Sequence, residues 1–365
     1  MKIKDIISCI EEFAPISLQE SWDNAGLQVG DPSSEIESAL ITLDVTEAVI
    51  DDAIRHGEKL IIAHHPLIFS GIKKLNGKND VERTLIKAIK NDISIYAAHT
   101  NIDVVQNGVS WKMAEKLGLK QVKTLSPTSG LLKKLVTFVP VEYAEKVREA
   151  ISLAGAGNIG NYDSCSFNTE GLGSFRGNET TNPFVGEKGK LHFEKEVRIE
   201  TIFPTYLQSK IVAALQTNHP YEEVAYDIYP LDNKHGLIGL GVVGLLEEPV
   251  ELKDFLRLLK TTFCCETIRY SGDTNKNISK VALCGGAGSS LLNDAKKAGA
   301  DIFITGDYKY HQFFDAENQI VIADIGHFES EQFTKELFYE IVTNKFSKFA
   351  IRLTDVQTNP VKHLF

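Results

Sequence analysis

Histidine and carboxylate side chains, which bind divalent metal ions, follow short apolar runs at three places in this 365-residue chain. His64 and His65 stand together in K-L-I-I-A-H-H-P, and Asp103 closes Y-A-A-H-T-N-I-D. Far downstream, His327 and Glu331 occur in I-A-D-I-G-H-F-E-S-E. Ligands collect at the carboxyl ends of strands in open α/β sheets, and imidazole nitrogen with carboxylate oxygen suits hard and borderline cations. The pattern therefore predicts a metal site for two ions.

The adjacent histidines allow more than one interpretation. Neighbouring side chains on a regular strand point to opposite faces of the sheet, but Pro66 takes the chain out of regular pairing after His65. Each histidine could bind one of two ions, or both could flank a single ion. A pair of hydrogen-bonded histidines at a strand end is the alternative without metal.

The other two signals are weak when each is taken alone. His327 and Glu331 are four residues apart, a spacing that places two side chains on one face of a helix. An ordinary ion pair at a helix start, where Glu suits the helix dipole, has the same spacing. Asp103 alone is typical of a turn or a cap. Their coincidence with His64 and His65 at strand ends, which we expect to belong to one sheet, supports the metal site.

Further polar residues lie near the same predicted strand ends. His99 could be a ligand or a proton carrier, and we prefer a role in which it orients a ligand without touching the ion. Asp44 is a second candidate for such an orienting role. For Asp307 and His311, in T-G-D-Y-K-Y-H, a structural role is the preferred interpretation.

Two motifs have alternatives that the sequence leaves open. The segment C-G-G-A-G-S-S (284–290) could bind phosphate at a helix start, but it lacks the Lys-Ser/Thr of a P-loop. We expect tight packing of a strand-to-helix turn instead. His219 in N-H-P-Y-E-E-V-A-Y (218–226) is interpreted as part of a turn rather than as a metal ligand.

Composition excludes several classes of protein. Hydrophobic residues make up 43% and charged residues 24%, as in ordinary globular proteins. The net charge of -10 argues against broad binding of nucleic-acid phosphates. We expect no membrane span, because the apolar runs are short, and the charged N-terminus is unlike a secretory signal. The five scattered cysteines favour a reduced, cytoplasmic protein without a disulfide framework.

Hydrophobic patterning predicts an α/β fold with two similar halves. Strands alternate with helices of crossover length at both ends of the chain, which is typical of mostly parallel sheets. The predicted strands are 39–45, 59–65, 93–99, 280–288, 300–307 and 319–327. The predicted helices in these halves are 46–56, 81–90, 109–117, 291–299 and 330–342.

The middle of the chain follows a different pattern. A strand, a helix at 144–153, a turn-rich stretch at 155–190, further strands and a helix at 207–217 indicate a ferredoxin-like unit. We therefore predict two α/β halves that form one core, at 1–128 and 236–365. An inserted ferredoxin-like domain at 129–235 interrupts them.

Several blocks resemble a known family. They are E-S-W-D-N-A-G-L-Q-V-G (20–30), I-A-H-H-P (62–66), A-A-H-T-N-I-D (97–103), T-G-D (305–307) and D-I-G-H-F-E-S-E (324–331). They closely resemble the signature blocks of the GTP cyclohydrolase 1 type 2 homologues, also called the NGG-interacting-factor-three-like family. The resemblance covers the α/β core in order. The middle segment resembles the PII/CutA-like domain of the longer bacterial members.

The resemblance implies a dinuclear metal site and a homohexameric, toroid-like assembly with its sites facing an internal cavity. The implied metal ligands are His64, His65, Asp103, His327 and Glu331. Trp22 and Asp23 precede the first strand, and we expect them to shape the cavity wall or a subunit contact rather than to bind metal.

Two functional hypotheses follow, and whether the protein is an enzyme stays open between them. In the first, it is a metal-dependent hydrolase similar to GTP cyclohydrolase 1 type 2, with a hydroxide bridging two ions and Glu331 or His99 moving protons. The ions would be zinc, with manganese or iron as alternatives, and the substrate a small molecule such as a nucleotide. In the second, it is a non-catalytic metal-binding regulatory or scaffold protein whose inserted domain senses a ligand.

Overall fold

The chain divides into two compact units in the computed structural model, which describes residues 1–272 and 276–364. The core unit combines Met1–Pro127 with Leu237–Phe365, and the middle unit is Thr128–Gly236. The α/β fold class predicted from the sequence is confirmed. Within the described ranges, no helix has both the length and the apolarity needed to cross a membrane.

The first sheet of the core unit has the strand order β1-β4-β3-β2-β15. Neighbouring strands are parallel except β1, which is antiparallel to β4. The elements of this part are α1 (Ile3–Phe13), β1 (Gly26–Val29), β2 (Ser38–Thr42), α2 (Glu47–His56), β3 (Leu60–Ala63), α3 (Asp80–Lys90), β4 (Ser94–Ala97) and β15 (Ala350–Leu353). All four residues of β3 and of β4 are buried, as expected for parallel strands that are covered on both faces.

The second sheet has the order β11-β14-β13-β12-β10-β5, with β12, β13 and β14 parallel. Its strands are β5 (Lys120–Pro127), β10 (Gly239–Glu251), β11 (Arg269–Tyr270), β12 (Asn277–Leu283), β13 (Ile302–Thr305) and β14 (Val321–Asp324). The remaining α-helices of the core unit are α4 (Thr100–Asp103), α5 (Val109–Lys116), α8 (Leu252–Thr262), α9 (Leu292–Lys297), α10 (His327–Glu331) and α11 (Thr334–Lys345). Phe255, Leu259 and Phe263 bury the apolar face of α8 against this sheet.

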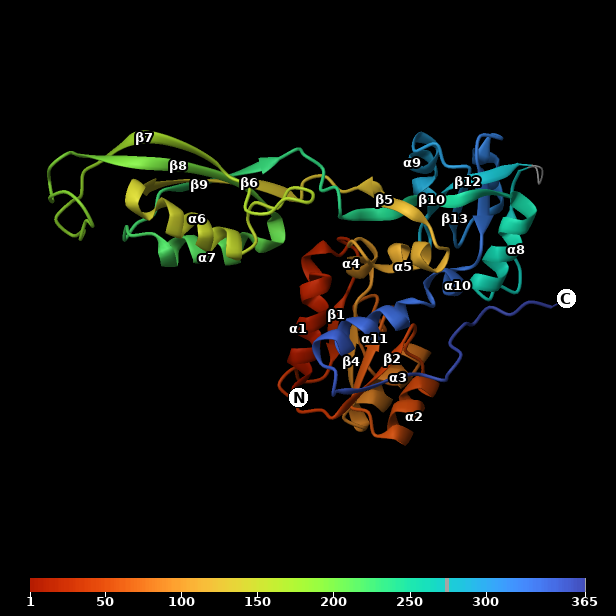
Figure 1. Cartoon of the computed structure of the whole chain (residues 1–365). Helices are drawn as coiled ribbons and strands as arrows, with labels where there is room; N and C mark the ends of the chain where they lie inside the picture. Colours follow the sequence, from red (N-terminus) through yellow and green to blue (C-terminus); the bar gives the residue numbers. More distant parts are fainter. Residues whose placement is uncertain (273–275, 365) are drawn as a thin grey trace. The chain divides into compact units, whose positions relative to one another are not determined.

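The strand ends that carry the predicted metal ligands belong to two sheets, so the expectation of a single sheet was wrong. Figure 1 shows β1 to β4 of the first sheet in red and orange, and β10 to β14 of the second sheet in green and blue. Two strands also depart from the predicted division into halves. β5 precedes the middle unit but pairs with β10, and β15 lies near the C-terminus but pairs with β2. Strand partners depend on long-range packing, which local hydrophobic patterns do not report.

The middle unit has a four-stranded antiparallel sheet of order β7-β8-β6-β9. Its elements are β6 (Leu132–Pro140), α6 (Ala144–Leu153), β7 (Phe167–Phe175), β8 (His192–Pro204), α7 (Gln208–Asn218) and β9 (Tyr226–Leu231). Both helices lie on one face of the sheet (Figure 1), where they pack on Leu135, Val139, Val197 and Ile199. The β-α-β-β-α-β order is that of the ferredoxin-like motif. That this unit is an inserted PII/CutA-like domain stays a prediction.

β7 lies in the stretch 155–190, which we expected to be turn-rich. Most of its residues are exposed, so it lacks the alternation of apolar and polar residues that marks a half-buried strand. The helices predicted at 46–56, 81–90 and 144–153 match α2, α3 and α6 to within one residue. Short 3-10 helices occur at Ile16–Leu18, Val141–Tyr143, Thr205–Leu207, Ser289–Leu291 and Tyr310–Ala316.

Candidate metal centre

Three strand ends in the core unit bring the predicted ligands together. β3 ends at Ala63, immediately before His64 and His65. β4 ends at Ala97, and the short helix α4 that follows carries Asp103 at its last position. β14 leads through Gly326, whose φ of 96° is one that side-chain-bearing residues rarely adopt, into α10 with His327 and Glu331 at its ends.

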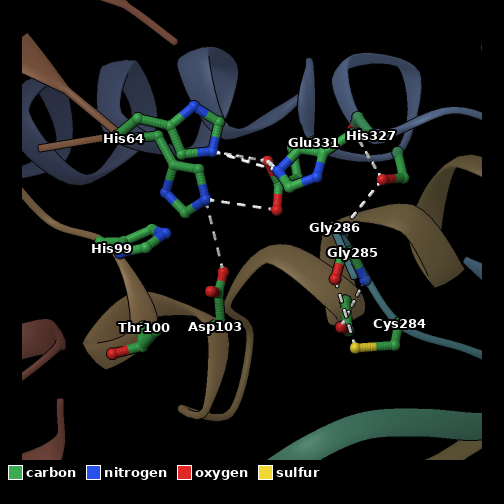
Figure 2. A network of polar contacts seen from close by, with 12 residues as sticks. His64, His99, Thr100, Asp103, Cys284, Gly285, Gly286, His327 and Glu331 are labelled. Carbon is green, nitrogen blue, oxygen red and sulfur yellow. Dashed lines mark hydrogen bonds and ion pairs between the residues drawn. The ribbon is translucent and has the colours of Figure 1, made fainter. Parts of the chain in front are cut away.

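The Glu331 carboxylate lies at the centre of this group. Its Oε2 is 3.0 Å from the Nε2 atoms of both His65 and His327. Its Oε1 is 3.6 Å from His64 Nε2. Figure 2 shows His64, His327 and Glu331 pointing toward one another, although they come from two different sheets. Glu331 is only 3% exposed, so these nitrogens take the place of solvent around a buried charge.

Asp103 and His64 face each other without a hydrogen bond. The Oδ1 atom of Asp103 lies 3.7 Å from His64 Nε2 (Figure 2). Both atoms are fully buried and lack a hydrogen-bond partner among the described residues. Buried polar atoms are rarely left unpaired, and an imidazole nitrogen opposite a carboxylate oxygen is a donor set that divalent cations bind. The residues present therefore fit a bound metal ion.

Each histidine of the cluster has its Nδ1 atom held by a fixed acceptor. His65 Nδ1 donates to Asp44 at 2.7 Å, and His327 Nδ1 donates to Asp307 at 2.7 Å. The partner of His64 Nδ1 is the carbonyl oxygen of Ala98, at 2.9 Å. Metal-binding histidines typically have their second nitrogen held in this way. The arrangement fixes the rings so that Nε2 is directed to the centre of the cluster.

His99 extends the cluster on the side of the first sheet. Its ring centroid lies 5.3 Å from that of His64 and 5.4 Å from that of His65. Asp23 accepts a hydrogen bond from His99 Nδ1 at 2.8 Å and others from the main-chain N–H and hydroxyl of Thr100. Asp23 thus contacts His99 rather than the centre of the cluster.

Two overlapping sets of residues in this cluster could hold a metal ion. One set is His64, His65 and His99, and the other is His65, His327 and Glu331. Asp103 lies beside His64 but belongs to neither set. The structure thus brings all the predicted ligands into one region, while their assignment to particular ions stays a prediction.

The electrostatics of the histidines are set by the buried carboxylates. Burial lowers the pKa of His65, but hydrogen bonds to Asp44 and Glu331 outweigh burial and raise the pKa to about 10. Burial also lowers the pKa of His327, but its hydrogen bonds to Glu331 and Asp307 outweigh burial and raise the pKa to about 9. The surroundings of both rings therefore favour a positive charge.

Burial has different net effects on the pKa values of Glu331 and Asp103. Burial alone would raise the pKa of Glu331, but the charge of His64 and the hydrogen bond from His327 hold it well below its usual range. Burial dominates at Asp103 and raises its pKa to about 6 despite the neighbouring His64. Of these two carboxylates, Asp103 is the one whose surroundings disfavour the charged form.

Sequence reasoning assigned several nearby residues incompletely. Asp307, expected to be structural, holds His327, while Asp44 does have the orienting position predicted for it. His311 contacts Tyr310 and Phe314 instead of the cluster. Asp307 lies 20 residues before His327 in the sequence, so its hydrogen bond to His327 became visible only in the folded structure.

Sequence reasoning also missed the C-terminal segment but did identify the glycine-rich loop 284–290, for which tight packing is the preferred interpretation. Thr358 donates to Asp44 at 2.7 Å. Gly286 has a φ of 62°, and a Cβ at this position would lie 2.3 Å from Glu331 Oε1. The loop 284–290 thus leaves space for the Glu331 carboxylate, which supports the packing interpretation over phosphate binding.

A cavity of about 530 Å³ opens beside the cluster. His65, His327, Asp44 and Asp307 line one part of it, and Asn359 of the C-terminal segment lines another. Small-molecule sites usually have volumes of roughly 300–1,000 Å³. The cluster therefore adjoins a space that suits a small substrate.

Comparison with known proteins gives a consistent result over the whole chain. The family model described as Duf34/NIF3 (NGG1p interacting factor 3) matches residues 1–360. A Halalkalibacterium halodurans protein named GTP cyclohydrolase 1 type 2 homolog is 42% identical over 360 residues, covering 97% of each chain. A Bacillus subtilis protein of the same name is 40% identical over 367 residues, covering 99% of this chain and 98% of the relative.

Solved structures agree with these similarities. The crystal structure of a Bacillus cereus protein related to NIF3 has a TM-score of 0.87 and 42% identity, and the match covers 100% of this chain and 99% of that one. A Staphylococcus aureus protein has a TM-score of 0.79 and 29% identity over the same shares. The family resemblance seen in the sequence blocks is thereby confirmed.

Proposed function

Since this chain belongs to the Duf34/NIF3 family, we propose that it binds two divalent metal ions at the candidate metal centre and hydrolyses a small molecule there. The observation that carries the proposal is the meeting of His64, His65, His327 and Glu331 around buried, incompletely paired atoms. The relatives are named for homology to a GTP cyclohydrolase. A purine nucleotide such as GTP is therefore the first substrate to test.

Five residues would hold the ions. They are His64, His65, Asp103, His327 and Glu331. Five donor residues exceed the three or four protein ligands typical of one zinc ion, which supports two ions rather than one. Nitrogen and oxygen donors without thiolate favour zinc, with manganese and iron as alternatives. Bound ions of this kind would supply Lewis acidity, lowering the pKa of water and polarising a carbonyl, imine or phosphoryl group.

Positioning in this site would come from the carboxylates around the histidines. Asp44 and Asp307 fix the His65 and His327 rings, so the ligand atoms need no rearrangement when an ion binds. Both oxygens of Glu331 already lie near histidine nitrogens, so its role is to hold the centre. Among the chain's own groups, His99 is then the better candidate for moving a proton during ring opening.

His99 is suited to that role by its surroundings. Its Nδ1 is bonded to Asp23, which leaves Nε2 as the nitrogen that can exchange a proton with a substrate. The ring also contacts Trp22 at 6.0 Å and Phe69 at 6.4 Å between centroids. General acid–base groups must lie within hydrogen-bond reach of the reacting atom, and His99 lies at the edge of the cluster.

The experiment is a turnover assay with matched variants. GTP consumption and formate release are measured for protein loaded with zinc, manganese or iron. Metal-dependent turnover that disappears in Glu331→Ala and persists in Glu248→Ala, which alters an exposed carboxylate on β10, supports the proposal. Two bound ions per chain with no turnover of GTP or of a wider panel of hydrolase substrates would contradict it.

A second function is favoured by the organisation of the chain. The middle unit has its own hydrophobic core and its own cavity of about 590 Å³. The protein could thus be a metal-binding regulator or scaffold in which the middle unit senses a ligand. The ends of this unit are adjacent, because His235 N donates to Thr128 O at 2.9 Å, so residues 130–235 can be replaced by a short linker. Catalysis that survives this deletion favours the hydrolase, and loss of a ligand response without any catalysis favours the regulator.

The assembly is a separate part of the proposal. We expect a homohexamer, as the family resemblance implies. Sedimentation velocity of the full chain and of the variant without residues 130–235 measures the subunit number. It also shows whether the middle unit contributes to assembly.

A further inference from the structure

The middle unit contains a buried carboxylate that forms no ion pair with any side chain in the described ranges. Glu196 on β8 is only 8% exposed. Its Oε1 accepts a hydrogen bond from the Tyr221 hydroxyl at 2.8 Å. The described part of the chain offers it no ion pair, and the nearby Arg198 is paired with Glu200 at 2.9 Å. A buried carboxylate is costly unless a cation compensates its charge.

His219, whose ring contacts that of Tyr221, does not supply that cation. His219 Nδ1 accepts a hydrogen bond from Tyr221 N, and its Nε2 donates to the carbonyl oxygen of Phe138. A ring that accepts at one nitrogen and donates at the other is neutral. Burial also lowers the pKa of His219.

Glu196 faces a cavity on the side of the sheet opposite the helices. Val197 and Ile199 on β8 belong to the hydrophobic core under α6 and α7. Side chains alternate along a strand, so Glu196 and Arg198 point to the other face. Together with Phe138, which pairs with Arg198, they line the cavity of about 590 Å³. This volume lies within the usual range of small-molecule sites.

The end of β7 and two loops border the cavity with aromatic rings. Phe175 and Phe184 lie 5.8 Å and 6.3 Å from the Tyr221 ring, measured between centroids. The main-chain N–H of Asn182 donates to Glu222 at 2.7 Å, which ties the loop after β7 to the loop before β9. Aromatic faces attract cations, most strongly where water is excluded. Aromatic rings beside a carboxylate therefore select positively charged organic groups.

Two glycines on β7 line this cavity. A Cβ at Gly173 would lie 2.1 Å from Glu196 Oε2, so the carboxylate occupies the position of the missing side chain. A Cβ at Gly171 would meet no atom within 4 Å. Glycine inside a strand often marks the close approach of a ligand. The carboxylates along the lining, Glu170, Glu196, Glu222 and Glu223, outnumber Arg176 and Arg198 there.

We propose that this cavity binds an organic ammonium ion, a protonated amine with an apolar or aromatic body. The ammonium group would lie against Glu196, and the body of the ligand would lie between Phe175, Phe184 and Tyr221. The site is independent of the candidate metal centre, because every residue that lines it belongs to the middle unit.

The test uses the full chain and three probes of similar shape. They are 2-phenylethylamine as the cation, 2-phenylethanol as the neutral probe and phenylacetate as the anion. Binding is followed by ligand-observed NMR and by calorimetry. The cation is expected to bind at least about tenfold more tightly than the other two probes, because a desolvated cation–π and carboxylate contact is lost without the charge. Equal binding of the three probes, preference for the anion, or no binding of the cation overturns the proposal.

Matched variants locate the site. Glu196→Gln retains the shape and the hydrogen bond from Tyr221, and it is expected to weaken binding of the cation about tenfold. Gly171→Leu places a side chain in open space and is expected to remove binding by filling the cavity. Glu149→Gln, which changes an exposed carboxylate on α6, is expected to leave binding unchanged. Cation binding that persists in both Glu196→Gln and Gly171→Leu contradicts this location.

Discussion

Glu331 in the core unit and Glu196 in the middle unit are both buried carboxylates, but their neighbours differ. Histidine nitrogens surround Glu331, and further carboxylates fix the rings of two of those histidines. Glu196 has a tyrosine hydroxyl and aromatic rings around it. The first environment offers several lone pairs to one point, as metal ions require. The second offers one charge and apolar faces, which suit an organic cation.

A third buried carboxylate shows the case in which the protein supplies its own cation. Glu58 is 4% exposed, and Arg352 on β15 donates to both of its oxygens, at 2.7 Å and 2.9 Å. The Nη1 atom of Arg352 also lies 3.1 Å from Oδ2 of Asp52. The comparison indicates that Glu58, unlike Glu196, needs no ligand to compensate its charge.

The substitution with the largest expected effect should disturb metal binding in the core unit and leave ligand binding in the middle unit unchanged. Glu331→Gln removes the central charge of the metal site, and we expect metal affinity to fall by more than about 100-fold, beyond the 10–100-fold typical of residues that only orient ligands. Metal per chain after dialysis is measured by elemental analysis. Binding of 2-phenylethylamine should remain unchanged. An unchanged metal content would show that Glu331 is not part of the metal site.

A core substitution in the middle unit tests whether the two environments are independent. Phe203 is 1% exposed in the hydrophobic core of that unit. Phe203→Ala should destabilise the middle unit by about 3–5 kcal/mol, which hydrogen exchange resolved by peptide can measure. We expect the metal content of this variant to remain unchanged. Loss of metal together with the middle unit would mean that the two sites depend on one cooperative fold.

The residues that hold the histidine rings should have intermediate effects. Asp44→Asn weakens the acceptor for His65 Nδ1, and we expect metal affinity to fall about 10–100-fold with the ligands unchanged. Asp51→Asn, an exposed neighbour on α2, is the control. Competition with a chelator measures both affinities. Equal affinities in the two variants would argue against an orienting role for Asp44.

Asp23 offers a sharper version of the same test. It holds His99, which lies outside the five predicted ligands, so Asp23→Ala should reduce metal content less than His64→Ala does. The same dialysis experiment compares the two variants. If both lose metal completely, the assignment of Asp23 to the cavity wall or a subunit contact is wrong.

The smallest expected effect concerns Glu58 and Asp52, the carboxylates that pair with Arg352. Arg352→Met should reduce the free energy of unfolding by about 2 kcal/mol at pH 7, less than for a fully buried pair because Arg352 is partly exposed. Burial raises the pKa of Asp52, but the hydrogen bond from Thr354 and the ion pair with Arg352 outweigh burial and lower the pKa. A lowered pKa stabilises the fold above the unfolded value of about 3.9, and this contribution is lost as the pH falls further.

The difference in stability between wild type and Arg352→Met should therefore narrow below about pH 4. Urea denaturation at a series of pH values measures it. A difference that stays constant down to pH 3 would assign the effect of Arg352 to packing instead of charge.

Much of the candidate metal site could be predicted because its signals are local. β3, β4 and β14 are short runs of fully buried residues, and such runs are recognisable without any knowledge of their partners. His64 and His65 follow one of these runs directly, and His327 and Glu331 share a single short helix. The α/β class and the candidate ligand residues therefore followed from neighbouring residues in the chain.

Local patterns did not report which strands pair or which side chains meet across the fold. β5 and β15 joined sheets that their positions in the chain did not suggest, because pairing depends on packing between distant segments. The bond from Thr358 to Asp44 joins residues 314 positions apart. No spacing rule connects such residues.

The sequence by itself determined where chemically suitable side chains would lie along the chain, since strand ends and helix starts are set by local burial and turn residues. Tertiary structure alone decided that two sheets, not one, deliver those side chains to a common point. It also decided that Glu196 would be buried beside a tyrosine hydroxyl while Glu58 would meet Arg352. The physical reason is that the stability of a buried charge depends on the atoms packed around it, and those atoms come from remote parts of the chain.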